Sequence, residues 1–144
     1  MTQLRKTLLL VEVGVCFVPA IFQLMLGLIV APMQIFFLAT AEAKAQLGAL
    51  GFLAIVAAGI CGLVALHSVM KWLLSQTATN LRPKTVVYLM GIGMFPLIAT
   101  APFAVHNTIG VITVILPLAG SVHLAWLARD YLFSSFFSPS ATGR

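Results

Sequence analysis

Charged side chains are scarce in this sequence of 144 residues. Only 8% of the residues are Asp, Glu, Lys or Arg, whereas 61% are hydrophobic, and the mean hydropathy is +1.10. A soluble domain carries roughly 25% charged residues, and a chain of this size with so few would lack the polar side chains to cover its surface. A lipid bilayer removes that requirement, so the composition indicates an integral membrane protein.

The motifs of common soluble enzymes are also missing. The sequence contains no pairing of a nucleophile with a base, no phosphate-binding loop and no HExxH zinc motif. Its two cysteines, Cys16 and Cys61, lie inside apolar runs and belong to no Cys-x-x-Cys or Cys/His metal pattern, so we expect them to be packing residues. The sequence therefore favours a non-enzymatic protein without a metal site or cofactor.

Basic residues outnumber acidic ones by eight to three, which gives a formal net charge of +5. They stand singly or in pairs between long apolar runs and form no basic patch, so we expect no nucleic-acid partner. In a membrane protein such residues mark the cytoplasmic loops and favour anionic lipid headgroups. The lipid bilayer is therefore the first expected partner.

Four apolar runs are long enough to cross the hydrocarbon core, which takes roughly 20 helical residues. They predict transmembrane helices over about residues 7–30, 47–70, 86–105 and 109–133. The first run continues to about Ala39, so we expect Pro19 to kink the helix and Pro32 to break it before a helical or interfacial extension. This run is about twice as long as the apolar core of a signal peptide, so we interpret it as an uncleaved helix.

The distribution of basic residues predicts the orientation. With the N-terminus inside, seven of the eight Lys and Arg residues lie on the cytoplasmic side, and only Lys44 lies outside. We therefore predict an all-α membrane protein of the inner (plasma) membrane, a four-transmembrane-helix bundle with both termini cytoplasmic. The short turn at residues 106–108 predicts that helices three and four form a tight hairpin. We expect one domain over residues 1–133 and a disordered tail over residues 134–144.

Small residues indicate where the helices pack. Ala54, Ala58 and Gly62 recur at four-residue spacing on the second span, and Gly120 lies in the middle of the fourth. Lipid chains are as apolar as leucine, so helices in a bilayer associate through close contacts between such residues. The partner helix can belong to the same chain, to a second copy or to another membrane subunit.

Glu12 is an acidic residue inside the first span. It follows Lys6 by six residues, which places it about 9 Å further along the helix axis. Gln23 lies within about 60° of the direction of Glu12, so the helix has one semi-polar stripe. Acidic residues in a span are costly and usually face the bundle or an aqueous pocket. Two interpretations stay open: a proton carrier, and a glutamate near the interface that reaches water or pairs with a local base.

His67 and His123 lie at a similar depth. His67 precedes Lys71 by four residues and His123 precedes Arg129 by six, so each lies about 6–9 Å inside the cytoplasmic boundary. They can be interfacial or hydrogen-bonded histidines, members of a proton or metal site with Glu12, or the two ligands of a haem. His67 points away from the stripe of small residues on its helix, which weighs against a shared site.

The stretch LLLVEVG at residues 8–14 resembles the first helix of the small multidrug resistance exporters, which are four-helix proteins with an essential glutamate in that helix. The similarity covers this helix alone, and the chain has a longer inner loop and lacks that family's aromatic pattern in helices two and three. The resemblance implies that one glutamate in a four-helix protein can suffice for proton coupling.

Three functions remain open from the sequence. The first is a non-enzymatic subunit or accessory that acts through helix–helix association, as a homo-oligomer or with other membrane subunits. The second is a proton-coupled small-molecule transporter or channel that uses Glu12. The third is a haem or metal redox subunit that uses His67 and His123.

Overall fold

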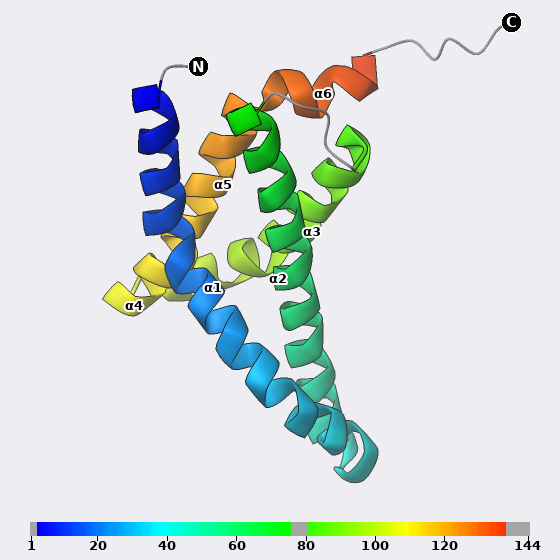
Figure 1. Ribbon diagram of the computed structural model, residues 1–144. Helices are drawn as coiled ribbons and strands as arrows, with labels where there is room; N and C mark the ends of the chain where they lie inside the picture. Colours follow the sequence, from blue (N-terminus) through cyan, green and yellow to red (C-terminus); the bar gives the residue numbers. More distant parts are fainter. Residues whose placement is uncertain (1–2, 76–80, 138–144) are drawn as a thin grey trace, which may run out of the picture.

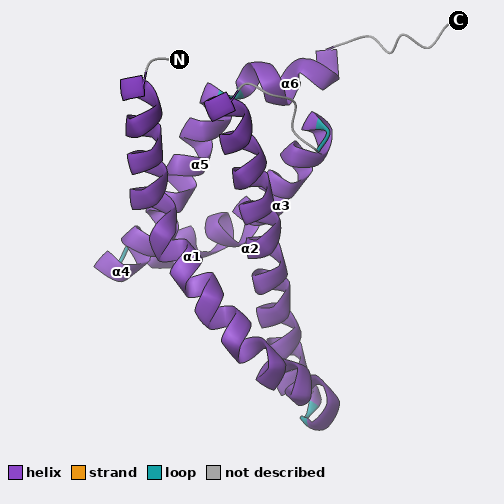
Figure 2. Cartoon of the chain, viewed as in Figure 1, coloured by secondary structure: helices purple, strands orange, loops and turns teal. Residues whose placement is uncertain are grey.

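The computed structural model describes residues 3–75 and 81–137, and nearly all of them are helical (Figure 2). The elements in chain order are α1 (Gln3–Thr40), α2 (Ala43–Ser75), α3 (Pro83–Ala104), α4 (Thr108–Gly110), the π-helical segment η1 (Val111–Ile115), α5 (Leu116–Leu127) and α6 (Arg129–Phe137). The predicted all-α class is confirmed.

Within the described residues, four helical stretches are long and apolar enough to cross a membrane: Gln3–Thr40, Ala43–Ser75, Pro83–Pro102 and Thr108–Leu127. Their most apolar windows have mean hydropathies of 1.6 to 2.5, and at most 22% of any window is buried by protein. An α-helix satisfies its backbone hydrogen bonds within its own segment, which hydrocarbon requires. The four predicted apolar helices are therefore present, and most of their side chains face the surroundings of the bundle.

The helix ends divide the basic residues between the two ends of the bundle (Figure 1). The start of α1, the end of α2, the start of α3 and the end of α5 lie together, and α6 lies across this end. The basic residues of these segments are Arg5, Lys6, Lys71, Arg82, Lys84 and Arg129. Lys44 belongs to the opposite end, next to the turn between α1 and α2.

α1 and α2 form a long hairpin. Their 38 and 33 residues correspond to about 57 and 50 Å, whereas the 22 residues of α3 correspond to about 33 Å. The turn of the hairpin therefore extends well beyond α3 and α4 (Figure 1). The predicted break at Pro32 does not occur, because α1 continues helically through both Pro19 and Pro32 to Thr40. Near the turn, the amide of Gln46 donates a hydrogen bond of 3.2 Å to the carbonyl of Leu38.

The fourth predicted span is divided into two helices. α5 ends at Leu127, the chain turns at Ala128 with φ −95° and ψ 11°, and α6 lies across the end of the bundle (Figure 1). Tyr131 of α6 stacks on Trp72 of α2 with the ring centroids 5.2 Å apart, and Leu132 is buried. α6 also includes residues 134–137, which we predicted as the start of the tail. The rest of that tail, residues 138–144, lies outside the described residues.

Two glycines form a close backbone contact between α2 and α3. A Cβ on Gly62 would lie 3.3 Å from Cα of Gly93, and a Cβ on Gly93 would meet backbone atoms of Gly62 and the Ala58 carbonyl oxygen. Ala58 is buried beside this contact, whereas Ala54 is exposed. The backbones can approach this closely only because both positions lack a side chain.

We expect Gly93→Ala to destabilise the bundle by about 1–3 kcal/mol, because the added methyl group overlaps the α2 backbone, which cannot rotate away. Unfolding by sodium dodecyl sulfate, followed by circular dichroism in detergent micelles, measures the change. Gly91→Ala is the matched control on the same helix, since no atom lies within 4 Å of its added Cβ. Equal stability of the two variants would contradict the backbone contact.

Candidate functional site

α1 and α5 approach closely at Gly120, one of the predicted packing residues. A Cβ on Gly120 would lie 3.0 Å from Cβ of Cys16 and 3.1 Å from Cε2 of Phe17, so any larger residue there would push these side chains away by a few tenths of an ångström. Pro117 and Ser121 of α5 are buried on either side of it. We call this region the α1–α5 interface, defined by Glu12 and Cys16 of α1 with Gly120 and His123 of α5.

Glu12 and His123 form a hydrogen-bonded ion pair across the α1–α5 interface, between Oε1 of the carboxylate and Nδ1 of the imidazole. The Glu12 and His123 side chains are 30% and 47% exposed, so neither is sealed inside the bundle. The pair carries opposite charges when the imidazole is protonated, and Nδ1–H then donates to the carboxylate. Two groups that each bind a proton thus share one contact between two membrane-spanning helices.

His67 lies apart from this pair. It is exposed on α2, and within residues 3–75 and 81–137 it forms no hydrogen bond or ion pair with Glu12 or His123. In the same part of the chain, no three His, Cys, Asp or Glu side chains lie grouped as a metal ion would require. The structure thus brings together two of the three residues that the depth estimate placed at one level.

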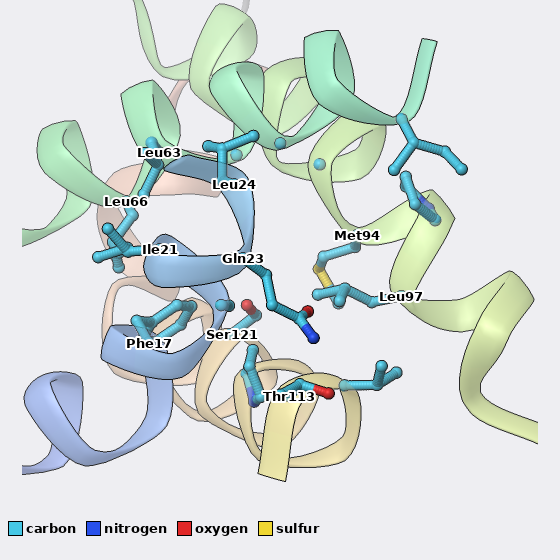
Figure 3. Close-up of a pocket in the computed structure, with 18 of the residues that line it drawn as sticks. Phe17, Ile21, Gln23, Leu24, Leu63, Leu66, Met94, Leu97, Thr113 and Ser121 are labelled. Carbon is cyan, nitrogen blue, oxygen red and sulfur yellow. The ribbon is translucent and has the colours of Figure 1, made fainter. Parts of the chain in front are cut away.

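Gln23, the other polar residue of the α1 stripe, lies eleven residues after Glu12, which is about 16 Å along the axis. It lines a separate cavity between α1, α2, α3, η1 and α5 with a volume of about 400 Å³. Figure 3 shows its amide extending from α1 between Met94 and Leu97 of α3 and Thr113 of η1. The two polar residues of the α1 stripe therefore have different surroundings: Glu12 pairs with His123, and Gln23 lines the cavity.

The walls of the cavity are mainly apolar. Among the lining residues that Figure 3 labels are Phe17, Ile21, Leu24, Leu63, Leu66 and Met94. Four of its lining side chains are polar but uncharged, namely those of Gln23, Thr100, Thr113 and Ser121. The Thr100 and Thr113 hydroxyls donate to the carbonyls of Pro96 and Ile109, at 2.8 and 2.7 Å. An apolar hollow with a few convergent polar groups is the usual form of a small-molecule site.

Sequence reasoning did not identify Gly93, Thr113 or Ser121 as site residues. One signal for the last two was present, because Thr113, Pro117 and Ser121 recur at four-residue spacing and so share one helix face. A second indication comes from the structure and not from the sequence: residues 111–115 are π-helical, and such segments are frequent at functional sites. That geometry becomes visible only in three dimensions.

A double-mutant cycle tests the energetic contribution of the ion pair. We expect Glu12→Gln and His123→Gln to be coupled by about 0.5–1 kcal/mol in the free energy of unfolding, because either change alone removes the same partly exposed contact. The measurement is unfolding by sodium dodecyl sulfate of the two single variants and the double variant. Glu12→Gln combined with His67→Gln is the control, and these two effects should add. Additivity in both cycles would argue against the ion pair.

The chain matches no protein-family model, no curated protein and no solved structure. Its functional residues are therefore inferred from chemistry and geometry alone.

Proposed function

We propose that the chain is a multi-pass protein of the plasma (inner) membrane, with both termini cytoplasmic and its last two spans arranged as a hairpin. The support is the gathering of basic residues at the end of the bundle where α1 begins and α5 ends, whereas Lys44 is the one Lys or Arg at the other end among residues 3–75 and 81–137. Cytoplasmic loops are enriched in Lys and Arg, so this end faces the cytoplasm.

Its proposed role is the proton-coupled transport of a small molecule, with Glu12 as the proton carrier and His123 as its partner. The observation that carries this proposal is the Glu12–His123 pair, which joins α1 to α5 inside the predicted spans. Ionisable groups in a membrane span are costly, and they typically mark proton or substrate pathways. The same two helices continue into the walls of the cavity, where a substrate would bind.

Protonation of Glu12 changes the contact between the helices. An ionised Glu12 attracts a protonated His123 and draws α5 toward α1. A protonated Glu12 is neutral and keeps only a hydrogen bond, so the attraction falls and the α1–α5 interface can open. A proton taken up on one side of the membrane would thereby favour one arrangement of the cavity walls, and its release on the other side would favour the second.

Proton flux into proteoliposomes tests this role. The vesicles enclose a pH-sensitive dye, and a potassium gradient with valinomycin drives protons inward. We expect wild-type protein to acidify the lumen and Glu12→Gln to slow this at least tenfold, because glutamine carries no exchangeable acid proton. Glu42→Gln, in the turn at the opposite end of the bundle, should conduct like the wild type. If Glu12→Gln conducts at the wild-type rate, the proposed carrier is wrong.

A second candidate function, a subunit or accessory that acts through helix–helix association, is favoured by the long α1–α2 hairpin. Its part near the turn extends beyond α3 and α4 as two helices only (Figure 1). Large apolar side chains are exposed there, including Ile29 at 74%, Phe36 at 63% and Leu47 at 70%. Another hairpin of this kind, from a second copy or from a different membrane subunit, would cover this surface.

The particle mass in mild detergent tests the association. We expect a complex larger than one chain by light scattering. We expect Phe36→Gln with Leu47→Gln to shift it to the monomer, because α1 is about 57 Å long, the hydrocarbon core is about 30 Å thick, and the end of the hairpin therefore meets water, where lost apolar surface weakens association. Phe95→Gln is the control, since Phe95 is 70% exposed on α3, away from the hairpin turn. A wild-type particle that is strictly monomeric and has no partner would exclude this function.

A further inference from the structure

The size of the cavity limits what it can hold. Its volume of about 400 Å³ lies within the range of small-molecule sites. No Asp, Glu, Lys or Arg is among the described residues that line it, so a charged ligand would lose its hydration there without gaining a partner. The ligand is therefore small, neutral and mostly apolar.

Ser121 indicates that the ligand also has a polar group. It lines the cavity and is only 7% exposed, yet its hydroxyl has no hydrogen-bond partner among residues 3–75 and 81–137. Serine and threonine hydroxyls in helices often bond to the carbonyl four residues earlier, as those of Ser68 and Thr113 do here. A buried polar group without a partner is costly, so an unused hydroxyl at a cavity wall is available for a bound molecule.

Gln23 of α1, the helix that packs beside α5, provides a second polar contact. Its amide reaches into the same space from α1, and it too has no hydrogen-bond partner in the described part of the chain (Figure 3). An amide and a hydroxyl can each donate and accept, and neither carries charge, so together they suit one neutral group such as a hydroxyl or a carbonyl. The remaining walls suit a hydrocarbon body.

We infer that the cavity binds a neutral amphipathic molecule, a hydrocarbon chain or ring system with one hydroxyl or carbonyl head that Gln23 and Ser121 bind. This inference rests on the proposed transport function, because it names the chemical class of the transported substrate. An aliphatic alcohol represents the class in the experiment below.

Photolabelling in liposomes tests the inference. The probe is dodecanol with a diazirine in its chain, and labelled peptides are identified by mass spectrometry. We expect labels on cavity-lining residues of α1, α2 and α3, such as Leu24, Leu63 and Met94. Unlabelled dodecanol should compete more strongly than dodecane, which fills the same space without a head group. One hydrogen bond contributes about 0.5–1.5 kcal/mol, so the two competitors should differ about two- to twelvefold in the concentration required.

Variants separate recognition of the head group from loss of the fold. Ser121→Ala and Gln23→Leu should each weaken labelling about two- to twelvefold, because each removes one polar partner and leaves the apolar walls. Ser68→Ala and Gln34→Leu remove the same kinds of group from positions outside the cavity and should label like the wild type.

Three outcomes would overturn the inference: absent labelling, labels spread evenly over lipid-facing positions, or equal competition by dodecane and dodecanol. Equal competition would mean that the cavity accepts any hydrocarbon chain, including that of a membrane lipid. Labelling that fails while proton flux still depends on Glu12 removes the inference and leaves the transport role. Labelling that succeeds in a protein without Glu12-dependent flux removes the transport role and leaves a binding protein.

Discussion

Hydrocarbon cannot hydrogen-bond to a peptide group, so each spanning segment must satisfy its own backbone as a helix. This chain meets that requirement while placing prolines inside its spans, and every such proline removes one N–H from the helical ladder. Two of them, Pro96 and Pro117, lie in the wall of the cavity. Before Pro117 the backbone adopts π-helical geometry, and four residues after Pro96 the Thr100 hydroxyl donates to the Pro96 carbonyl. Prolines and π-helical segments bend helices, so helices that contain them do not pack as straight cylinders.

The same requirement governs the polar side chains. Three hydroxyl groups, those of Thr100, Thr113 and Ser68, donate hydrogen bonds to carbonyls of their own helices. Their donors are therefore already satisfied within the helix. Glu12 cannot do this, and it pairs with His123 from another helix. Gln23 and Ser121 are different, since both keep polar groups directed into an apolar cavity. In a medium that penalises every unpaired polar group, these exceptions indicate where the protein interacts with something other than itself.

Much of the fold follows from one-dimensional patterns, whereas the site does not. Run lengths predict the four apolar helices, and distances from basic residues place Glu12 and His123 at one level. The same arithmetic gives His67 an equal depth, yet in the described part of the chain His67 is exposed on α2 and does not bond to Glu12 or His123. Gly91 and Gly93 look alike in the sequence, yet only Gly93 touches α2. α5 ends at Leu127, and α6 packs on α2 through the Tyr131 and Trp72 rings. Neither feature can be predicted from hydropathy, because the apolar run continues to Phe133.

Two helices, α1 and α5, connect the Glu12–His123 pair to the cavity. For the pair to change ligand binding in the cavity, it must contribute a sufficient coupling free energy through these helices. Effects of one site on another typically amount to about 1–3 kcal/mol, which changes an affinity about 5- to 150-fold. Exposed ion pairs contribute about 0–1 kcal/mol, and Glu12 and His123 are both partly exposed. The pair alone therefore reaches only the lower end of that range in water. Low-dielectric surroundings strengthen the attraction, so a bilayer that covers these side chains raises their influence on the cavity. In the proposed mechanism, coupling would depend on how deeply the membrane covers the start of α1. The close contact of Gly120 with Cys16 and Phe17 lies between the pair and the cavity, so a shift of α5 would have to pass through it.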